Sequence, residues 1–483
     1  MITKYVVELK PYSFREMCSF LECSDSEAIR IIKELKSYKV LKELRSKDVN
    51  RDLSDLIDES LAVEEVDANG NLLYYAFCYV GVIKVARCIF LCVPKYLTST
   101  DNYHDKLKEI IRVLKHYNSK KQIVSLFNDI DNRLVFNDLA VYLFLLEDYF
   151  ENGGYINEID ILEINGNGAI NWNRTINSAY AIIQSKRPYY TELYTHRRRK
   201  NDHDYFKRLH ECVLTIASNE LVQSGIADLF DLSPVHLSEQ KLDDFGEQEY
   251  ILYRVENELN SQFNTRKQNI LKTIYAYISQ TGNTSADGGL SMFGTNTFNL
   301  VWQSVCSQVL NNMLDLPLHG YSETEYETTL RSLIVKPKWY VKSEDGSPQF
   351  VAESDTLVPD IVVCYRRSVD GELCFVIFDA KYYSLTLENG MRLSGNPGIE
   401  SISKQYFYEL AFFDFIKEQR IVNFANGFLF PAESGEFENI GFVEFGVFKN
   451  LSRIQILRLP ADQMFKYYLN GTVLTADEIG VLF

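Results

Sequence analysis

Two aspartates in the last third of the chain stand where apolar, strand-like segments meet polar sequence. Asp360 directly precedes the apolar run of residues 361–363, and Asp379 directly follows the apolar run of residues 373–378. Between these runs, residues 368–372 have the composition of a hairpin turn. Because an antiparallel hairpin places the start of its first strand beside the end of its second, we expect the two carboxylates to lie together.

The residues that follow Asp379 complete a set of groups suited to metal-dependent hydrolysis. The carboxylates of Asp360 and Asp379 and the carbonyl oxygen of Ala380 are hard oxygen ligands, which favour Mg²⁺, with Mn²⁺ as an alternative ion. Lys381 could orient or activate the attacking water and stabilise developing charge. The pattern thus predicts cleavage of a phosphodiester. A purely structural Asp–Lys pair at a sheet edge is the alternative.

The motif is specific because of its context. The triplet acid-x-Lys also occurs at residues 8–10, 34–36 and 239–241, but only the copy at 379–381 follows a Pro-Asp pair, at 359–360. The apolar run before Asp379 is typical of a central strand buried on both faces. Together these features resemble the core of PD-(D/E)xK nucleases. The resemblance implies an α/β, restriction-endonuclease-like domain at residues 290–483.

A helix is expected downstream of this motif. Its apolar positions should pack on the sheet, and they fall at residues 399, 402, 410, 413 and 416. Gln405 and Tyr408 are three residues apart and share a face. As in several nucleases of the PD-(D/E)xK superfamily, they could bind the water or a phosphate oxygen beside the metal. An ordinary, half-exposed helix face is the alternative.

Bulk properties indicate a multidomain globular protein. The chain has 483 residues, of which 46% are hydrophobic and 24% charged, enough for about two to four domains. No apolar run is long enough for a membrane span and the start lacks a signal-peptide pattern, so we expect a cytoplasmic protein. The nine cysteines fall mostly in apolar runs and include no Cys-x-x-Cys pair, and the seven histidines are scattered. Buried, reduced thiols are expected, and a histidine metal site is not.

The net charge of −16 argues for a local basic surface if the protein binds DNA. The best candidate cluster follows His196 and comprises Arg197, Arg198, Arg199 and Lys200. These residues could contact phosphates, or they could form a solvated face. The overall acidity also suggests that DNA capture is shared with another subunit.

The first 60 residues have the pattern of a winged-helix-like module. Positions 14, 17, 18 and 21 follow helical spacing, and Ser24 to Glu27 has the sequence of a capping box before a second helix. Extended structure is expected from Val40. Such a module can place its second helix in the DNA major groove or pack against protein. Both uses remain open.

Residues 61–280 are expected to form a mixed β and helical region. Strand patterns occur at 61–66, 72–86 and 88–93, and helical patterns dominate 103–150 and 170–280. A linker rich in Gly, Ser, Thr and Asn spans residues 279–289. No Walker-type phosphate loop is present in the sequence, so the chain should not hydrolyse nucleotides by itself. The predicted fold class is therefore multidomain α+β.

Several segments together resemble the LlaJI family of restriction endonucleases, relatives of the McrC nuclease subunit. The likeness lies in residues 14–42, 79–83, 93–96, 293–302 and the motif at 359–381. It implies an endonuclease subunit that cuts double-stranded foreign DNA with Mg²⁺. It also implies a GTP-hydrolysing AAA+ partner of the McrB type, docked on residues 61–250, so that GTP enters only through that partner.

Two other functions compete with this expectation. A non-catalytic, winged-helix DNA-binding regulator would bind DNA without cutting it. A repair or recombination nuclease of the PD-(D/E)xK type would cut junctions, flaps or single strands by itself. Cutting both strands of a duplex requires two active sites or sequential nicking, so a homo-oligomer is also considered.

One feature departs from many nucleases of this superfamily. They supply an additional glutamate from the helix before the hairpin, but residues 299–303 here contain no acid. Gln303 could occupy that position, or Glu353 or Asp355 could contribute a third carboxylate. Whether one metal ion or two would bind is therefore open.

Overall fold

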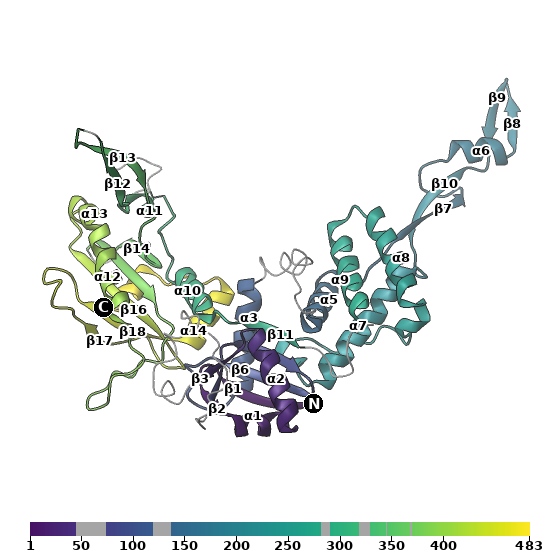
Figure 1. Ribbon diagram of the computed structural model, residues 1–483. Coiled ribbons are helices and arrows are strands. Elements are labelled where there is room, and N and C mark those ends of the chain that lie inside the picture. Colours follow the sequence, from purple (N-terminus) through teal and green to yellow (C-terminus); the bar gives the residue numbers. More distant parts are fainter. Residues whose placement is uncertain (45–73, 119–136, 282–289, 318–328, 344, 368–369) are drawn as a thin grey trace. The chain divides into compact units, whose positions relative to one another are not determined.

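The computed structural model is of mixed α+β architecture, with helices and several small sheets (Figure 1). It describes residues 1–44, 74–118, 137–281, 290–317, 329–343, 345–367 and 370–483. The chain divides into two compact units. One joins Met1–Leu134 to Met292–Phe483, and the other is Val135–Ser291.

This division differs from the three consecutive segments expected at 1–60, 61–280 and 290–483. Strand pairing is the reason. The strands at residues 74–93 pair with strands from the start of the chain, and the strand at 291–295 joins the same sheet. The chain thus leaves this unit to form the second one and then returns. The expected strand at 61–66 and most of the expected linker lie outside the described residues.

The N-terminal elements form a small helical and β module. Its members are β2 (Pro11–Ser13), α1 (Phe14–Leu21), α2 (Asp25–Ser37), β3 (Leu41–Leu44) and β4 (Tyr74–Phe77), with the sheet order β2-β4-β3. A capping box does occur here, but Ser13 and Glu16 form it at the start of α1. The capping box expected at Ser24 is wrong, because the hydroxyl of Ser24 contacts Ser26 Oγ instead, at 3.1 Å.

A four-stranded sheet combines one strand before this module, two strands after it and one strand from much later in the chain. Its order is β1 (Ile2–Val7), β6 (Cys88–Val93), β5 (Val80–Val85) and β11 (Ser291–Thr295). The close approach of β5 and β11 requires two glycines. A Cβ on Gly81 would lie 2.2 Å from the carbonyl oxygen of Phe293, and one on Gly294 would lie 2.1 Å from that of Val80. Both glycines also have positive φ, so only glycine fits either position.

A five-stranded mixed sheet carries the predicted motif. Its order is β14 (Ile361–Arg366), β15 (Leu373–Ala380), β16 (Asn423–Ala432), β18 (Ile454–Pro460) and β17 (Glu438–Val443). The antiparallel pairing of β14 with β15 confirms the predicted hairpin. β15 also pairs in parallel with β16, so it is an interior strand. Its residues 373–379 are all buried, as the continuous apolar run predicts.

Helices cover this sheet, and short elements connect its parts (Figure 1). They are α3 (Tyr103–Asn118), α10 (Phe298–Val309), α11 (Leu330–Leu333), β12 (Lys338–Lys342), β13 (Pro348–Glu353), α12 (Ile399–Ala411), α13 (Phe413–Glu418), α14 (Ala461–Asn470) and α15 (Ala476–Gly480). The largest buried side chains include Trp302 and Phe298 of α10 and Phe375 and Phe378 of β15. These residues form apolar support for the β14–β15 hairpin.

The predicted packing face of this helix is wrong at three of its five positions. Ile399, Leu410 and Phe413 are 60%, 44% and 52% exposed, whereas Ile402 packs against the core of the sheet and Ile416 is half-buried. The buried face of the helix instead carries Gln405 and Tyr406, with other polar side chains. The helix packs polar groups against the sheet because backbone carbonyl groups and a buried asparagine there offer hydrogen-bond partners.

The second unit combines a helical bundle with a β arm (Figure 1). Its elements are α5 (Asp138–Asn152), β7 (Glu158–Ile164), α6 (Trp172–Ser178), β8 (Ala181–Gln184), β9 (Arg187–Tyr190), β10 (Tyr194–Lys200), α7 (Tyr205–Gln223), the 3-10 turns η2 (Asp228–Phe230) and η3 (Leu242–Phe245), α8 (Gln248–Ser261) and α9 (Thr265–Thr281). Helical patterns were expected to dominate residues 170–280, but residues 181–184, 187–190 and 194–200 form strands instead. No helix in the described residues could cross a lipid bilayer.

Candidate active site

Hairpin register brings the two predicted aspartates together. Ile361 of β14 lies opposite Phe378 of β15, and one further step of this antiparallel register places Asp360 opposite Asp379. The Ala380 backbone N–H also donates to Asp360 Oδ2 at 3.1 Å. Asp360 is therefore held against the end of β15, as the sequence predicts.

The two carboxyl groups repel each other unless a proton or a cation lies between them. Burial, the charge of Asp379 and a hydrogen bond with Asp379 raise the pKa of Asp360 to about 8. Asp379 itself is only 7% exposed. Two neighbouring carboxylates in a partly buried site are unfavourable when both are ionised, unless a positive charge lies beside them.

Lys381 supplies part of that positive charge. Its Nζ lies 2.8 Å from Asp379 Oδ2, and its side chain is 16% exposed. The Lys381 backbone N–H donates to the carbonyl oxygen of Leu429 in β16 at 2.9 Å. The ammonium also lies 5.7 Å from the centre of the Phe428 ring. Lys381 is therefore anchored at its backbone while its charged end remains beside the carboxylates.

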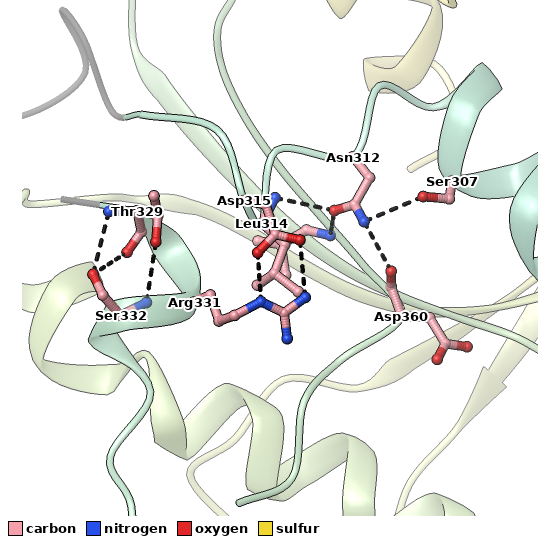
Figure 2. A network of polar contacts seen from close by, with 9 residues as sticks. Ser307, Asn312, Leu314, Asp315, Thr329, Arg331, Ser332 and Asp360 are labelled. Carbon is pink, nitrogen blue, oxygen red and sulfur yellow. Dashed lines mark hydrogen bonds and ion pairs between the residues drawn. The ribbon is translucent and has the colours of Figure 1, made fainter. Parts of the chain in front are cut away.

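Asn312 fixes the backbone on both sides of the first aspartate. Its Nδ2 donates to the carbonyl oxygen of Asp360 at 3.0 Å and to Ser307 Oγ at 3.2 Å. Its Oδ1 accepts from the Val362 N–H at 3.0 Å. Figure 2 shows the Asp360 carbonyl facing Asn312 while its carboxylate points away from this network. One side chain thus clamps the start of β14 without bonding to the Asp360 carboxylate, and no local pattern in the sequence indicates this role.

Gln303 is the side chain that reaches the position of a third acid. Its Nε2 donates to Asp360 Oδ1 at 2.7 Å, from a half-buried position on α10. Glu353 instead lies on β13, where its Oε1 is 3.9 Å from Lys338 Nζ, and Asp355 is exposed. Of the three candidates, the structure brings only Gln303 to the aspartates.

The helix residues Gln405 and Tyr408 have different surroundings. Gln405 is fully buried, and its Nε2 lies 3.4 Å from the carbonyl oxygens of Ile377 and Gly427. It thus contacts the backbone of the sheet. Tyr408 is 8% exposed, and burial together with the charges of Asp379 and Asp360 raises the pKa of its hydroxyl.

The donor set fits a small, hard divalent cation. Two carboxylates and the Ala380 carbonyl oxygen are available at the end of β15, and all are oxygen ligands of the kind that Mg²⁺ prefers. Among the described residues no cluster of three or more His, Cys, Asp or Glu side chains that could hold a metal ion is found. Burial is the largest cause of the raised pKa of Asp360, and the charge of Asp379 adds to it.

The basic cluster lies far along the chain, on β10 of the second unit. Arg197, Arg198, Arg199 and Lys200 pair with residues 158–161 of the antiparallel strand β7. Arg197 Nη1 forms a 2.6 Å ion pair with Glu163. In the part of the chain that the structure describes, no ion pair is found for the other three residues of the cluster. They are exposed, which suits contact with phosphates or solvation alike.

Comparison with known proteins gives the family. The model of the LlaJI restriction endonuclease family matches residues 79–462. The type II restriction enzyme BsuMI component YdjA of Bacillus subtilis (strain 168) is 28% identical over 425 residues, which are 86% of this chain and 84% of that protein.

Solved assemblies from Thermococcus gammatolerans also align with the chain. A refined half-complex of McrB AAA+ hexamers with bound McrC covers 97% of this chain and 99% of the matched chain, at 17% identity and a TM-score of 0.37. The McrBC complex covers 57% and 79%, at 16% identity and a TM-score of 0.24. The sequence match spans most of the chain and includes the aspartates and the lysine of the hairpin. The protein therefore belongs to the LlaJI restriction endonuclease family.

Proposed function

We propose that this chain is the nuclease subunit of a restriction system and hydrolyses phosphodiester bonds of double-stranded DNA in a Mg²⁺-dependent reaction. The observation that carries the proposal is the meeting of Asp360, Asp379 and Lys381 at the end of one buried hairpin. Membership of a restriction endonuclease family supports it. A structural Asp–Lys pair would not require a second buried carboxylate that raises the pKa of the first.

Each residue has a chemical role in this proposal. Asp360, Asp379 and the carbonyl oxygen of Ala380 would hold Mg²⁺, which polarises the scissile phosphate and acidifies a bound water. Lys381 orients the attacking water and stabilises charge on the phosphate oxygens. Gln303 fixes the rotamer of Asp360 through its 2.7 Å hydrogen bond.

The helix α12 contributes two further side chains, Tyr408 and Gln405. Tyr408 can donate its hydroxyl to a phosphate oxygen or to the water, because burial keeps it protonated beside the carboxylates. Gln405 would act from beneath, where its amide contacts the backbone of β15 and β16. Its role is to hold the helix on the sheet.

We further propose that the chain works with a GTP-hydrolysing AAA+ partner of the McrB type. The sequence contains no phosphate loop of its own, and the B. subtilis relative is described as a component of its enzyme. Residues 61–250 are the proposed docking region for that partner. Arg198, Arg199 and Lys200 are the proposed phosphate contacts of the second unit.

The test is cleavage of plasmid DNA by the full chain with its AAA+ partner, GTP and Mg²⁺. Asp379→Ala and Lys381→Ala should each lower the rate by about 10²–10⁴-fold. Lys466→Ala is the matched control, because it removes another lysine paired with an aspartate, on α14, and should cut normally. Undiminished cutting by both site variants would end the assignment. DNA binding without cleavage under every partner condition would favour the regulator instead.

A further inference from the structure

A buried glutamate from the first strand reaches the residue beside the catalytic lysine. Glu8 directly follows β1, and its backbone N–H donates to the carbonyl oxygen of Val93 at the end of β6, at 2.9 Å. Its side chain is buried, with 4% of the residue exposed. The Tyr382 hydroxyl donates to Glu8 Oε2, which also accepts from the Lys95 backbone N–H at 3.3 Å.

Tyr382 is immobilised on its other sides as well. Its ring centre lies 5.3 Å from that of Phe298 and 6.2 Å from that of Tyr96. The Lys95 ammonium lies 4.6 Å from the centre of the same ring. The residue is 5% exposed. Glu8 therefore satisfies the one polar atom of a side chain that is otherwise enclosed by aromatic rings and a cation.

The position of Tyr382 determines where Lys381 can point. Successive side chains of an extended segment face opposite sides, so a fixed Tyr382 leaves Lys381 the side that Asp379 occupies. The backbone is held next to it, because the Ala380 N–H donates to Asp360 and the Lys381 N–H donates to Leu429. The hydrogen bond to Glu8 is the contact that fixes the far end of this segment.

We propose that Glu8 is a positioning residue for the nuclease reaction, holding the Tyr382 hydroxyl and thereby keeping the Lys381 ammonium beside Asp379. This inference rests on the function proposed above. It gives the N-terminal sheet a direct part in catalysis, because Glu8 is set by the pairing of β1 with β6. Misplacement of a catalytic group by about 1 Å can cost on the order of 100-fold in rate.

A second hydrogen-bonded carboxylate, half-buried at Glu433, provides a matched control. Glu433 follows β16 and accepts from the Thr98 and Ser99 N–H groups at 2.9 and 3.0 Å, and it also pairs with Lys106. It thus ties the residues after β6 to the same sheet, as Glu8 does. However, it lies after the neighbouring strand, and among the described residues its hydrogen bonds and ion pair go to Thr98, Ser99 and Lys106, none of which is assigned to the reaction.

The experiment measures plasmid cleavage by the full chain with its AAA+ partner, at saturating DNA, GTP and Mg²⁺, together with Tm. Glu8→Ala and Tyr382→Phe should each lower kcat by about 10- to 100-fold while KM for DNA changes less than about twofold. The double variant should lose no more than either single variant. Glu8→Gln should recover most of the rate, because its amide oxygen still accepts from the tyrosine.

Glu433→Gln should lower Tm while leaving kcat within about twofold of wild type. If Lys381→Ala is inactive but Glu8→Ala and Tyr382→Phe cut at the wild-type rate, the positioning role is wrong and the nuclease proposal stands. Additive losses in the double variant, or an equal kcat loss in Glu433→Gln, would also overturn it. If Lys381→Ala cuts like wild type, the proposed function itself fails.

Discussion

Asp360 and Asp379 face each other across the ends of two antiparallel strands, and their carboxyl groups share a hydrogen bond. In the absence of a cation, a proton on Asp360 relieves their repulsion. In the function proposed above, a divalent ion would displace that proton so that both carboxylates could act as ligands. We therefore expect this one contact to affect the stability of the metal-free protein, its response to pH and its affinity for metal.

The metal-free protein should lose stability as pH rises. Folded Asp360 retains its proton to about pH 8, whereas the ordinary pKa is 3.8, so its stabilising contribution is complete below pH 4 and disappears toward pH 8. Asp379→Asn removes the facing charge and keeps an acceptor for Lys381. Thermal unfolding in EDTA should show that the free energy of unfolding falls with pH in both proteins. Between pH 4 and pH 8 we expect this fall to be smaller in the variant than in wild type, by on the order of 2 kcal/mol. Identical pH curves would contradict the account.

Replacing Gln303 should change the metal response of the site. Gln303→Glu exchanges the donor to Asp360 Oδ1 for a third carboxylate. The metal-free variant should lose about 1–3 kcal/mol of stability, and Mg²⁺ should raise its Tm more than that of wild type. Gln308→Glu is the control, because it removes a similar amide contact, to the Tyr468 carbonyl, from the same helix. Equal Mg²⁺ shifts in both variants would refute a ligand position at Gln303.

The glycine contact between β5 and β11 should be intolerant of any side chain. Gly294→Ala would place a Cβ 2.1 Å from the Val80 carbonyl oxygen, so we expect a loss of more than about 2 kcal/mol in chemical denaturation. Gly390→Ala also has positive φ but meets no atom within 4 Å. It therefore reports backbone strain without the overlap. Similar losses in the two variants would show that the close approach is unimportant.

Glu433 should support the fold in mild acid. Although burial opposes ionisation, hydrogen bonds from Lys106, Ser99 and Thr98 lower the pKa of Glu433 to about 2. Its contribution is thus present above the ordinary pKa of 4.5 and is lost as pH falls toward 2. Across that pH range the free energy of unfolding should fall further in wild type than in Glu433→Gln, by on the order of 1–2 kcal/mol. Glu444→Gln, which removes an exposed ion pair with Arg453, is the control and should match wild type. If the stability difference between wild type and Glu433→Gln did not change with pH, the assignment would be contradicted.

Local pattern was enough to predict the β14–β15 hairpin. A Pro-Asp pair, a turn and an apolar run ending in Asp379 determine two adjacent strands, and the register then aligns Asp360 with Asp379. Helix α1 likewise follows from its spacing of apolar residues. These features depend on neighbours in sequence, so one chain carries the information.

The remaining features depend on contacts between distant segments. The approach of Gly81 to Gly294 joins residues more than 200 positions apart, and Glu8 meets Tyr382 over 374 positions. Neither pair has a local signal. The packing face of helix α12 was mispredicted for a related reason, because apolar periodicity indicates a buried face only when the sheet beneath it offers no polar partners. In this protein Asn426 Nδ2 donates to the backbone carbonyl of Gln405, and Gln405 Nε2 donates to the carbonyl of Gly427.

The most direct test of the central claim is divalent-ion binding by the full chain, measured by electron paramagnetic resonance of added Mn²⁺. Wild type should bind Mn²⁺ at the hairpin, Mg²⁺ should displace it, and affinity should rise with pH toward 8 as Asp360 loses its proton. Asp360→Ala and Asp379→Ala should each reduce binding by at least about tenfold, while Glu433→Gln binds as wild type does. Unchanged Mn²⁺ binding in both aspartate variants would contradict the proposal that these carboxylates form the metal site.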